Sequence, residues 1–283
     1  MSEEGFFNQL ERIPRELIYA VLLIGLCYVL VYPVGLPIKV SGETKELYDS
    51  IEELPDDSVV LVDIAFGAGG MPELGPAFTA VMHHLYQRDL RVIVMTLYTE
   101  GPQMYDILVV NKIEPESSYD KTYGVDWCFF GYNAGGVTTM AELARNMRIL
   151  ETDYRDTPLD QLQVMEGVED YTDVDLVITF STSSGGISSP ADWVQQWATP
   201  YEVPMACVVL KMMIPTVSPY YGTGQVDALI PGAGASAEYE LLVNRPDEGL
   251  ASTDALSVAH LIVIILVILG NIAYFGKGGG IAT

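Results

Sequence analysis

The chain of 283 residues carries 38 acidic and 14 basic side chains, and its net charge at neutral pH is −24. This charge argues against nucleic acid as a partner, because binding nucleic acid depends on neutralising phosphates with Lys and Arg. It also disfavours direct binding to anionic lipid. Residues 34–256 hold most of the imbalance, with 34 acidic and 11 basic side chains, and are numerous enough to bury one sizeable core.

An apolar run near the N-terminus, residues 17–31, contains no charged side chain and continues weakly to Ile38. A bilayer core about 30 Å thick requires about 20 helical residues. We therefore predict a transmembrane helix over residues 17–38, after an N-terminal tail of residues 1–16. A cleaved signal peptide is the alternative, because Arg12 and Arg15 precede a short apolar stretch, but no small-residue cleavage site follows.

Buried strands alternate with amphipathic helices through the central region. Runs rich in Val, Ile and aromatic residues predict strands at residues 58–66, 91–98, 125–132, 174–180 and 205–212. Helical spacing of apolar residues predicts helices at 42–54, from 72 onward, and at 102–112, 140–150 and 190–197, with mostly helical structure over 225–243. Residues 151–173 are acidic and irregular. We predict one α/β domain over residues 39–256, with a doubly wound, mainly parallel sheet that is Rossmann-like or flavodoxin-like.

A second apolar run, residues 258–275, contains no acidic side chain, Lys or Arg. We predict a second transmembrane helix over residues 257–275, followed by a Gly-rich tail of residues 276–283. The alternative is a buried core helix, but the run is apolar on all faces. Two spans place both termini on one side. Basic residues near the spans divide evenly between the two sides, so we favour cytoplasmic termini because Arg12 and Arg15 directly precede the first span.

Three predicted strands end in turns that contain two adjacent glycines. Carboxyl ends of parallel strands lie along one edge, where doubly wound folds bind ligands and helix N-termini favour anions. We therefore predict a ligand-binding rim formed by nine turn residues: Gly67, Gly69, Gly70, Asn133, Gly135, Gly136, Ser183, Gly185 and Gly186. The alternative is that these glycines only permit tight turns. No turn matches G-x-G-x-x-G, and the chain has no P-loop motif, so nothing here favours a nucleotide.

A weaker hypothesis assigns catalysis to Lys211, at the carboxyl end of the last predicted strand. A desolvated Lys can lose its proton and act as a base or nucleophile. Its partners would be Ser183 or Ser184 on the neighbouring turn and Asp63 in the first strand. The competing interpretation is a structural ion pair between Lys211 and a carboxylate such as Asp63, which is favoured because no motif connects these residues.

Histidines and cysteines do not predict a metal site. His83 and His84 are adjacent on one helix and point about 100° apart, so they cannot share a metal. No Cys/His spacing is typical of zinc, and the acidic clusters lack the order of a calcium loop. Cys128 and Cys207 lie in predicted strands, and a disulfide between them requires neighbouring strands.

The chain resembles a group of uncharacterised prokaryotic two-span membrane proteins with a central α/β domain. The features that carry the resemblance are the RELIYAVLLIGL start, the Gly-x-Gly-Gly loop, the paired Gly-Gly turns and the HLIVIILVILGNIAYF end. The resemblance covers nearly the whole chain. It implies a two-span topology and no particular mechanism.

These features together predict a membrane-anchored, non-enzymatic scaffold or accessory subunit with an extracytoplasmic α/β domain. The expected partners are membrane lipid and either further copies of the chain or other membrane proteins. One alternative is a ligand-sensing or substrate-binding module that uses the Gly-rich rim. Another is a hydrolase with a Ser/Lys pair. No motif indicates a cofactor.

Overall fold

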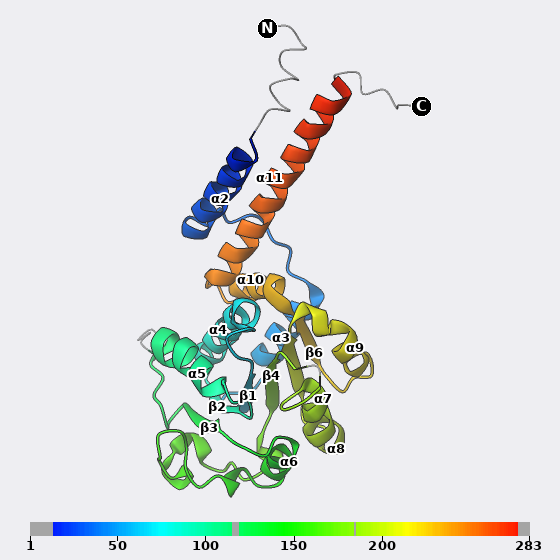
Figure 1. The fold of residues 1–283 in the computed structure, drawn as a ribbon. Helices are drawn as coiled ribbons and strands as arrows, with labels where there is room; N and C mark the ends of the chain where they lie inside the picture. Colours follow the sequence, from blue (N-terminus) through cyan, green and yellow to red (C-terminus); the bar gives the residue numbers. More distant parts are fainter. Residues whose placement is uncertain (1–13, 115–118, 184, 277–283) are drawn as a thin grey trace. The chain divides into compact units, whose positions relative to one another are not determined.

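The computed structural model describes residues 14–114, 119–183 and 185–276, and the chain divides into two compact units. Residues 38–249 form the larger unit, the α/β domain. The described residues up to Pro37 and from Leu250 onward form the smaller, helical unit. Figure 1 shows the elements of both units, coloured by their position in the sequence.

Six parallel strands form the sheet of the larger unit. Their order is β3-β2-β1-β4-β5-β6, which is the Rossmann order and differs from the flavodoxin-like order. The predicted α/β fold with a parallel sheet is confirmed, and so are its five predicted strands. The bounds of the strands are Val59–Ala65 (β1), Arg91–Thr96 (β2), Trp127–Tyr132 (β3), Leu176–Ser181 (β4), Met205–Val209 (β5) and Ala228–Pro231 (β6).

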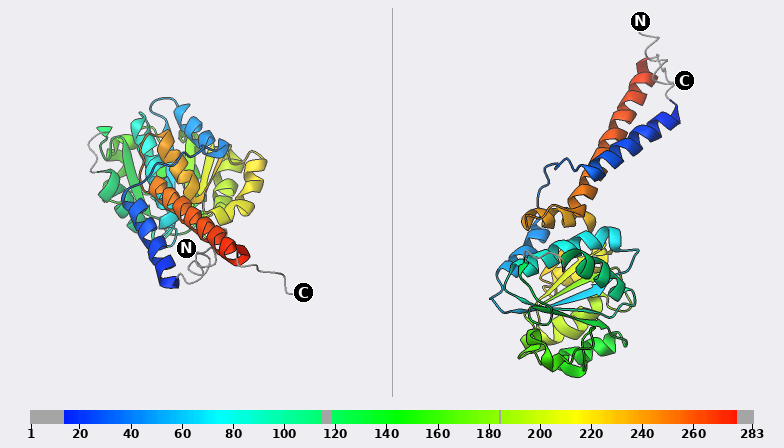
Figure 2. Two further views of the ribbon diagram at one scale, coloured as in Figure 1. Left: turned by 90° about the horizontal axis from the view of Figure 1, so that it is seen from above. Right: turned by 90° about the vertical axis from the view of Figure 1, so that its left-hand side faces the viewer.

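Helices cover both faces of the sheet (Figure 1), and Figure 2 shows the same layers of the domain from two further directions. One face packs against α3 (Gly42–Glu52), α4 (Met71–Gln87), α5 (Gly101–Tyr105), the π-helix η1 (Asp106–Ile113) and α10 (Gly232–Leu242). The other packs against α6 (Val137–Arg145), α7 (Pro190–Trp193), the π-helix η7 (Val194–Ala198), α8 (Thr199–Tyr201) and α9 (Ile214–Gly222). Strand β1 is buried on both faces, so it reads as a continuous apolar run interrupted only by Asp63.

The sixth strand corrects the prediction of mostly helical structure over residues 225–243. Residues Ala228 to Pro231 pair with β5, and only the following segment is helical, as α10. A run of three apolar residues is too short for its periodicity to distinguish strand from helix. Strand β5 is also shorter than predicted and ends at Val209, so Lys211 lies beyond the sheet.

The sheet order excludes a disulfide between Cys128 and Cys207. Cys128 lies in β3 and Cys207 in β5, with β2, β1 and β4 between them. Four strand spacings amount to about 19 Å, whereas bridged cysteines have Cα atoms less than about 7 Å apart. Both thiols are free and buried, and burial raises the pKa of each.

The smaller unit contains α2 (Arg15–Val31) and most of α11 (Glu248–Gly276). Of the described helices, α11 alone is long and apolar enough to cross a membrane, over Glu248–Ile272 with a mean hydropathy of 2.6. It begins well before the predicted residue 257. The predicted first span extends too far, because α2 ends at Val31 and the non-helical segment that follows contains Pro33 and Pro37. The N-terminal span, and with it the two-span topology, therefore stays a prediction.

Candidate functional site

The candidate site lies at the carboxyl edge of the sheet between β1 and β4. Strand order reverses at this point, because β2 and β3 extend from β1 in one direction and β5 and β6 extend from β4 in the other. Doubly wound proteins bind ligands in the crevice outside such a switch point. Two of the three Gly-Gly turns border it, those that follow β1 and β4.

The turn after β1 is filled by side chains of the same chain. The backbone N–H of Ala68 donates to Oε2 of Glu100 at 3.0 Å, and a Cβ added to Gly67 would overlap the Glu100 carboxylate. A Cβ added to Gly70 would overlap the Thr182 methyl group from the turn after β4. A Rossmann protein places the pyrophosphate of its ligand against the N–H groups of this turn. Here an internal carboxylate occupies that position.

The remaining rim glycines divide into two kinds. Gly135, Gly136 and Gly186 have φ of +113°, +56° and +140°, so the backbone itself requires glycine. Gly69 and Gly185 have open space around an added Cβ and no positive φ, so neither packing nor backbone conformation requires glycine there.

Asn133, the remaining residue predicted for the rim, uses its side-chain amide within its own turn. The amide donates to the carbonyl oxygens of Phe130 and Gly131, both at 3.3 Å. The side-chain contacts of Asn133 therefore stabilise the turn that follows β3.

Asp63 is fully buried in β1 and holds the segment that follows β4. Its Oδ2 accepts hydrogen bonds from Thr179 Oγ1 at 2.9 Å, Ser188 Oγ at 2.7 Å and Trp193 Nε1 at 2.7 Å. Ser188 has a φ of +59°, which is uncommon for a residue with a side chain. The Asp63 carboxylate thus fixes both the turn that carries Gly185 and Gly186 and the start of α7.

The protonation of Asp63 is set mainly by burial. Removal from water raises the pKa of this carboxyl to about 6, and the hydrogen bonds from Ser188, Trp193 and Thr179 oppose that rise. The second oxygen, Oδ1, has no hydrogen-bond partner in the described part of the chain. Burial therefore favours the protonated carboxyl, whereas the three hydrogen bonds to Oδ2 favour the ionised form.

Lys211 lies apart from Asp63. The Lys211 side chain is exposed, whereas the catalytic hypothesis requires a buried one. Its backbone N–H donates to Oε1 of Glu73 at 2.8 Å, and its Nζ forms no ion pair with any residue that the structure describes. The suggested ion pair between Lys211 and Asp63 is therefore wrong, since the partners of Asp63 are two hydroxyls and an indole.

The Ser/Lys pair gains no support from the described contacts. Ser184 lies outside the described residues. Ser183 belongs to the turn after β4, where its backbone N–H donates to Ser181 Oγ at 3.1 Å. No hydrogen bond joins Ser183 to Lys211, although both are described.

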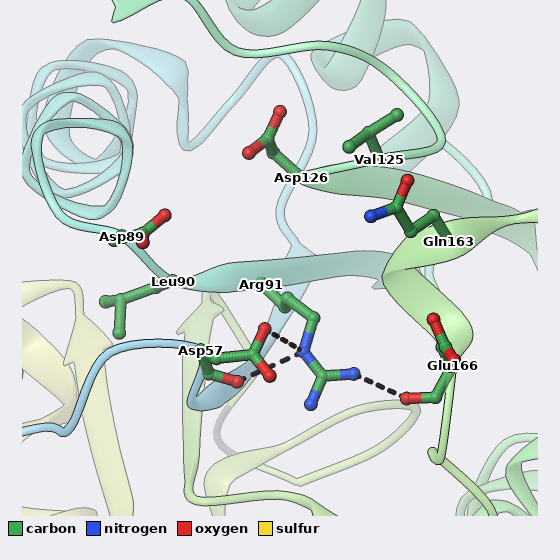
Figure 3. A pocket seen from close by; sticks show the side chains of 8 residues that line it. All are labelled: Asp57, Asp89, Leu90, Arg91, Val125, Asp126, Gln163 and Glu166. Atoms are coloured by element: carbon green, nitrogen blue, oxygen red, sulfur yellow. Dashed lines mark hydrogen bonds and ion pairs between the residues drawn. The ribbon is translucent and has the colours of Figure 1, made fainter.

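A pocket of about 320 Å³ lies at the opposite edge, at the amino ends of β2 and β3 (Figure 3). Its one basic side chain, Arg91, forms an ion pair of 2.9 Å with Asp57 and donates to the carbonyl oxygens of Asp57 and Glu166 at 3.0 and 2.7 Å. Figure 3 shows Arg91 crossing from the strand to these two loops. The guanidinium therefore cross-links the amino edge of the sheet.

The two adjacent histidines belong to the core. His84 contacts the hydroxyl of Tyr239 at 2.8 Å and Glu52 at 2.9 Å, while His83 contacts the hydroxyl of Tyr119 at 2.6 Å. Burial lowers the pKa of His84. Across residues 14–114, 119–183 and 185–276, no three His, Cys, Asp or Glu side chains are placed to share a metal ion.

Comparison with known proteins adds no family. No protein-family model matches the chain, and no curated protein matches it. The fold and the site geometry therefore define a Rossmann-type α/β protein whose switch-point turn is occupied by its own Glu100.

Proposed function

We propose that the chain is a membrane-anchored, non-enzymatic scaffold or accessory subunit that assembles through its α/β domain. The observation that carries this proposal is the hydrogen bond between Ala68 and Glu100. This hydrogen bond occupies a backbone N–H of the turn where a Rossmann fold would bind a phosphate. The net charge of −24 further disfavours an anionic cofactor at this turn. A second acidic residue near the switch point, Asp63, holds the segment that follows β4.

Anchoring is supported by α11 and by its contacts with the N-terminal segment. Gly25 of α2 lies so close to α11 that an added Cβ would be 2.9 Å from Cδ1 of Ile262. Small residues at such crossings are typical of helices that pack within lipid. The backbone N–H groups of Gly35 and Leu36 donate to the Asp254 carboxylate at 2.7 and 3.1 Å. We propose that α2 and α11 form a two-span anchor with both termini in the cytoplasm.

Orientation is tested by labelling a single surface cysteine. Cys27 is first replaced by Ser, because Cys128 and Cys207 are buried and already protected. Asp56→Cys then places a thiol on an exposed turn of the domain. We expect a membrane-impermeant maleimide to label this cysteine in intact cells. Labelling only after the cells are lysed would contradict the extracytoplasmic location.

Assembly is tested by the native mass of the full chain in detergent, measured by light scattering with the detergent contribution subtracted. We expect a mass of at least two chains, or a defined complex with another membrane protein when the chain is purified from its membrane. A strict monomer in both preparations would reject the scaffold. Melting temperatures with and without ATP or NAD test the cofactor prediction, and a saturable increase would oppose it.

A further inference from the structure

A second site lies at the carboxyl end of β6, between α3 and α9. It is a pocket of about 490 Å³, within the range of about 300–1,000 Å³ that small-molecule sites occupy. Its apolar wall is formed by Ile214, Pro215, Leu229 and Pro231. Such a surface contributes affinity for an apolar group through removal of that group from water.

Three polar side chains of the pocket have unused hydrogen-bonding capacity. Lys211, Glu43 and Ser218 line the pocket, and none of these side chains has a hydrogen bond or ion pair with another described residue. Most basic side chains of the domain are instead paired with acids, for example Lys112 with Asp247 at 2.7 Å. Lys211 therefore differs from these paired cations in having no acidic partner among the described residues.

Further charges around the pocket restrict the ligand class. The Tyr221 hydroxyl, which also lines the pocket, donates to Glu46 at 2.6 Å, and this bond raises the pKa of Tyr221 to about 12. Glu73 also lies beside Lys211, since it accepts the backbone N–H of Lys211. One cation among several carboxylates disfavours a phosphate or another strongly anionic ligand.

We propose that this pocket binds an apolar or aromatic α-amino acid. The ligand carboxylate pairs with Lys211, its ammonium group pairs with Glu43, and its side chain lies against the apolar wall. A zwitterion can pair with both charges, whereas a simple anion or cation can pair with only one of them. The proposal does not depend on membrane insertion or on self-assembly.

The test uses three probes that differ only in their charged groups. L-Phenylalanine carries both charges, 3-phenylpropanoate lacks the ammonium group, and 2-phenylethylamine lacks the carboxylate. Calorimetric titration of the full chain in detergent is expected to show saturable binding of L-phenylalanine with a Kd below about 1 mM. Each single-charge analogue is expected to bind at least about tenfold more weakly.

Variants then locate the binding. Lys211→Met and Glu43→Gln are each expected to weaken L-phenylalanine binding by about tenfold or more, and Ser218→Trp is expected to abolish it by filling the pocket. Arg145→Gln is the matched control, because Arg145 is an exposed cation of the same domain outside the pocket. Thermal melts check that every variant is folded. Absence of L-phenylalanine binding, equal affinity for either analogue, or binding unchanged by all three pocket variants would each overturn the proposal.

Discussion

The indole Nε1 of Trp193 donates a hydrogen bond of 2.7 Å to Oδ2 of Asp63, and the two residues lie 130 positions apart in the sequence. Both side chains are fully buried. The bond joins the central strand β1 to α7, and Ser188 reinforces it from the loop between β4 and α7. An acidic residue in an apolar strand therefore has an architectural role here, because it fixes the loop that borders the switch point.

Asp63→Asn is expected to reduce the dependence of stability on pH. The folded-state pKa of about 6 lies above the ordinary value of 3.8, so the stabilisation is complete below the lower value and is lost as pH rises through the upper one. The total change is about 3 kcal/mol. Chemical denaturation at pH 5 and pH 8 should therefore show a smaller loss for the Asn variant than for the wild type. An equal loss of stability between pH 5 and pH 8 in the two proteins would contradict the raised pKa of Asp63.

Asp63→Ala is the matched control for this experiment. It removes the acceptor of three buried donors, and each donor left without a partner costs about 1–3 kcal/mol. We expect destabilisation at both pH values, with little dependence on pH from this site. A variant as stable as the wild type at pH 5 would show that the three hydrogen bonds do not hold the loop.

Gly67→Ala and Glu100→Ala are expected to be energetically coupled. The methyl group that Gly67→Ala adds would overlap the carboxylate of Glu100, an exposed side chain that can rotate away, so this change alone should cost about 1 kcal/mol through loss of the hydrogen bond to Ala68. Removal of the Glu100 carboxylate makes space for that methyl group, and the double variant should recover at least about 1 kcal/mol relative to the sum of the single changes. Denaturant titration of the four proteins measures this cycle.

Gly69→Ala provides the control for that cycle, because an added Cβ at Gly69 meets no atom within 4 Å. Its effect on stability should lie within about 0.5 kcal/mol. Additive effects of Gly67→Ala and Glu100→Ala would show that Glu100 does not occupy the turn in solution.

Most of the sheet was predictable because its strands are buried on both faces. Continuous apolar runs such as β1 give a clear signal, and turn residues mark their ends. Strand β6 was not predictable, because its four residues become a strand only by pairing with β5. The order of the strands in the sheet could not be predicted from the sequence pattern either. The distance between Cys128 and Cys207 therefore became known only from the structure.

The position of the Gly-Gly turns was predictable from the sequence, but the contacts made within these turns were not. The Gly-Gly turns do lie at carboxyl ends of strands, as parallel geometry requires. The role of Glu100 was missed, because a single Glu after β2 carries no motif and its approach to Ala68 is set by strand adjacency. The partners of Asp63 were missed for a similar reason, since Trp193 comes from a helix far along the chain.

Cys128 and Cys207 are expected to resist thiol reagents in the folded protein. Both are buried, and burial raises the pKa of each thiol, so little reactive thiolate is present. In a Cys27→Ser background, Ellman's reagent should therefore detect almost no thiol under native conditions. It should detect two thiols per chain in denaturant without reductant. Fewer than two would indicate a disulfide between these cysteines, which the positions of β3 and β5 exclude within one chain, or another modification of a thiol.

Asp254→Ala is expected to release the segment that follows α2. The buried Asp254 carboxylate accepts the N–H groups of Gly35 and Leu36, so these amides should exchange slowly with solvent deuterium in the wild type. Loss of the acceptor should speed their exchange by about tenfold or more, since each bond contributes about 1.5 kcal/mol or more when its acceptor is charged.

Ser257→Ala is the control, because the Ser257 hydroxyl donates within α11, to the carbonyl oxygen of Thr253. Hydrogen exchange followed by mass spectrometry of peptides over residues 33–38 measures the difference. Equal exchange in the wild type and Asp254→Ala would show that Asp254 does not join this segment to α11, and the proposed two-span anchor would then lose one of its two contacts.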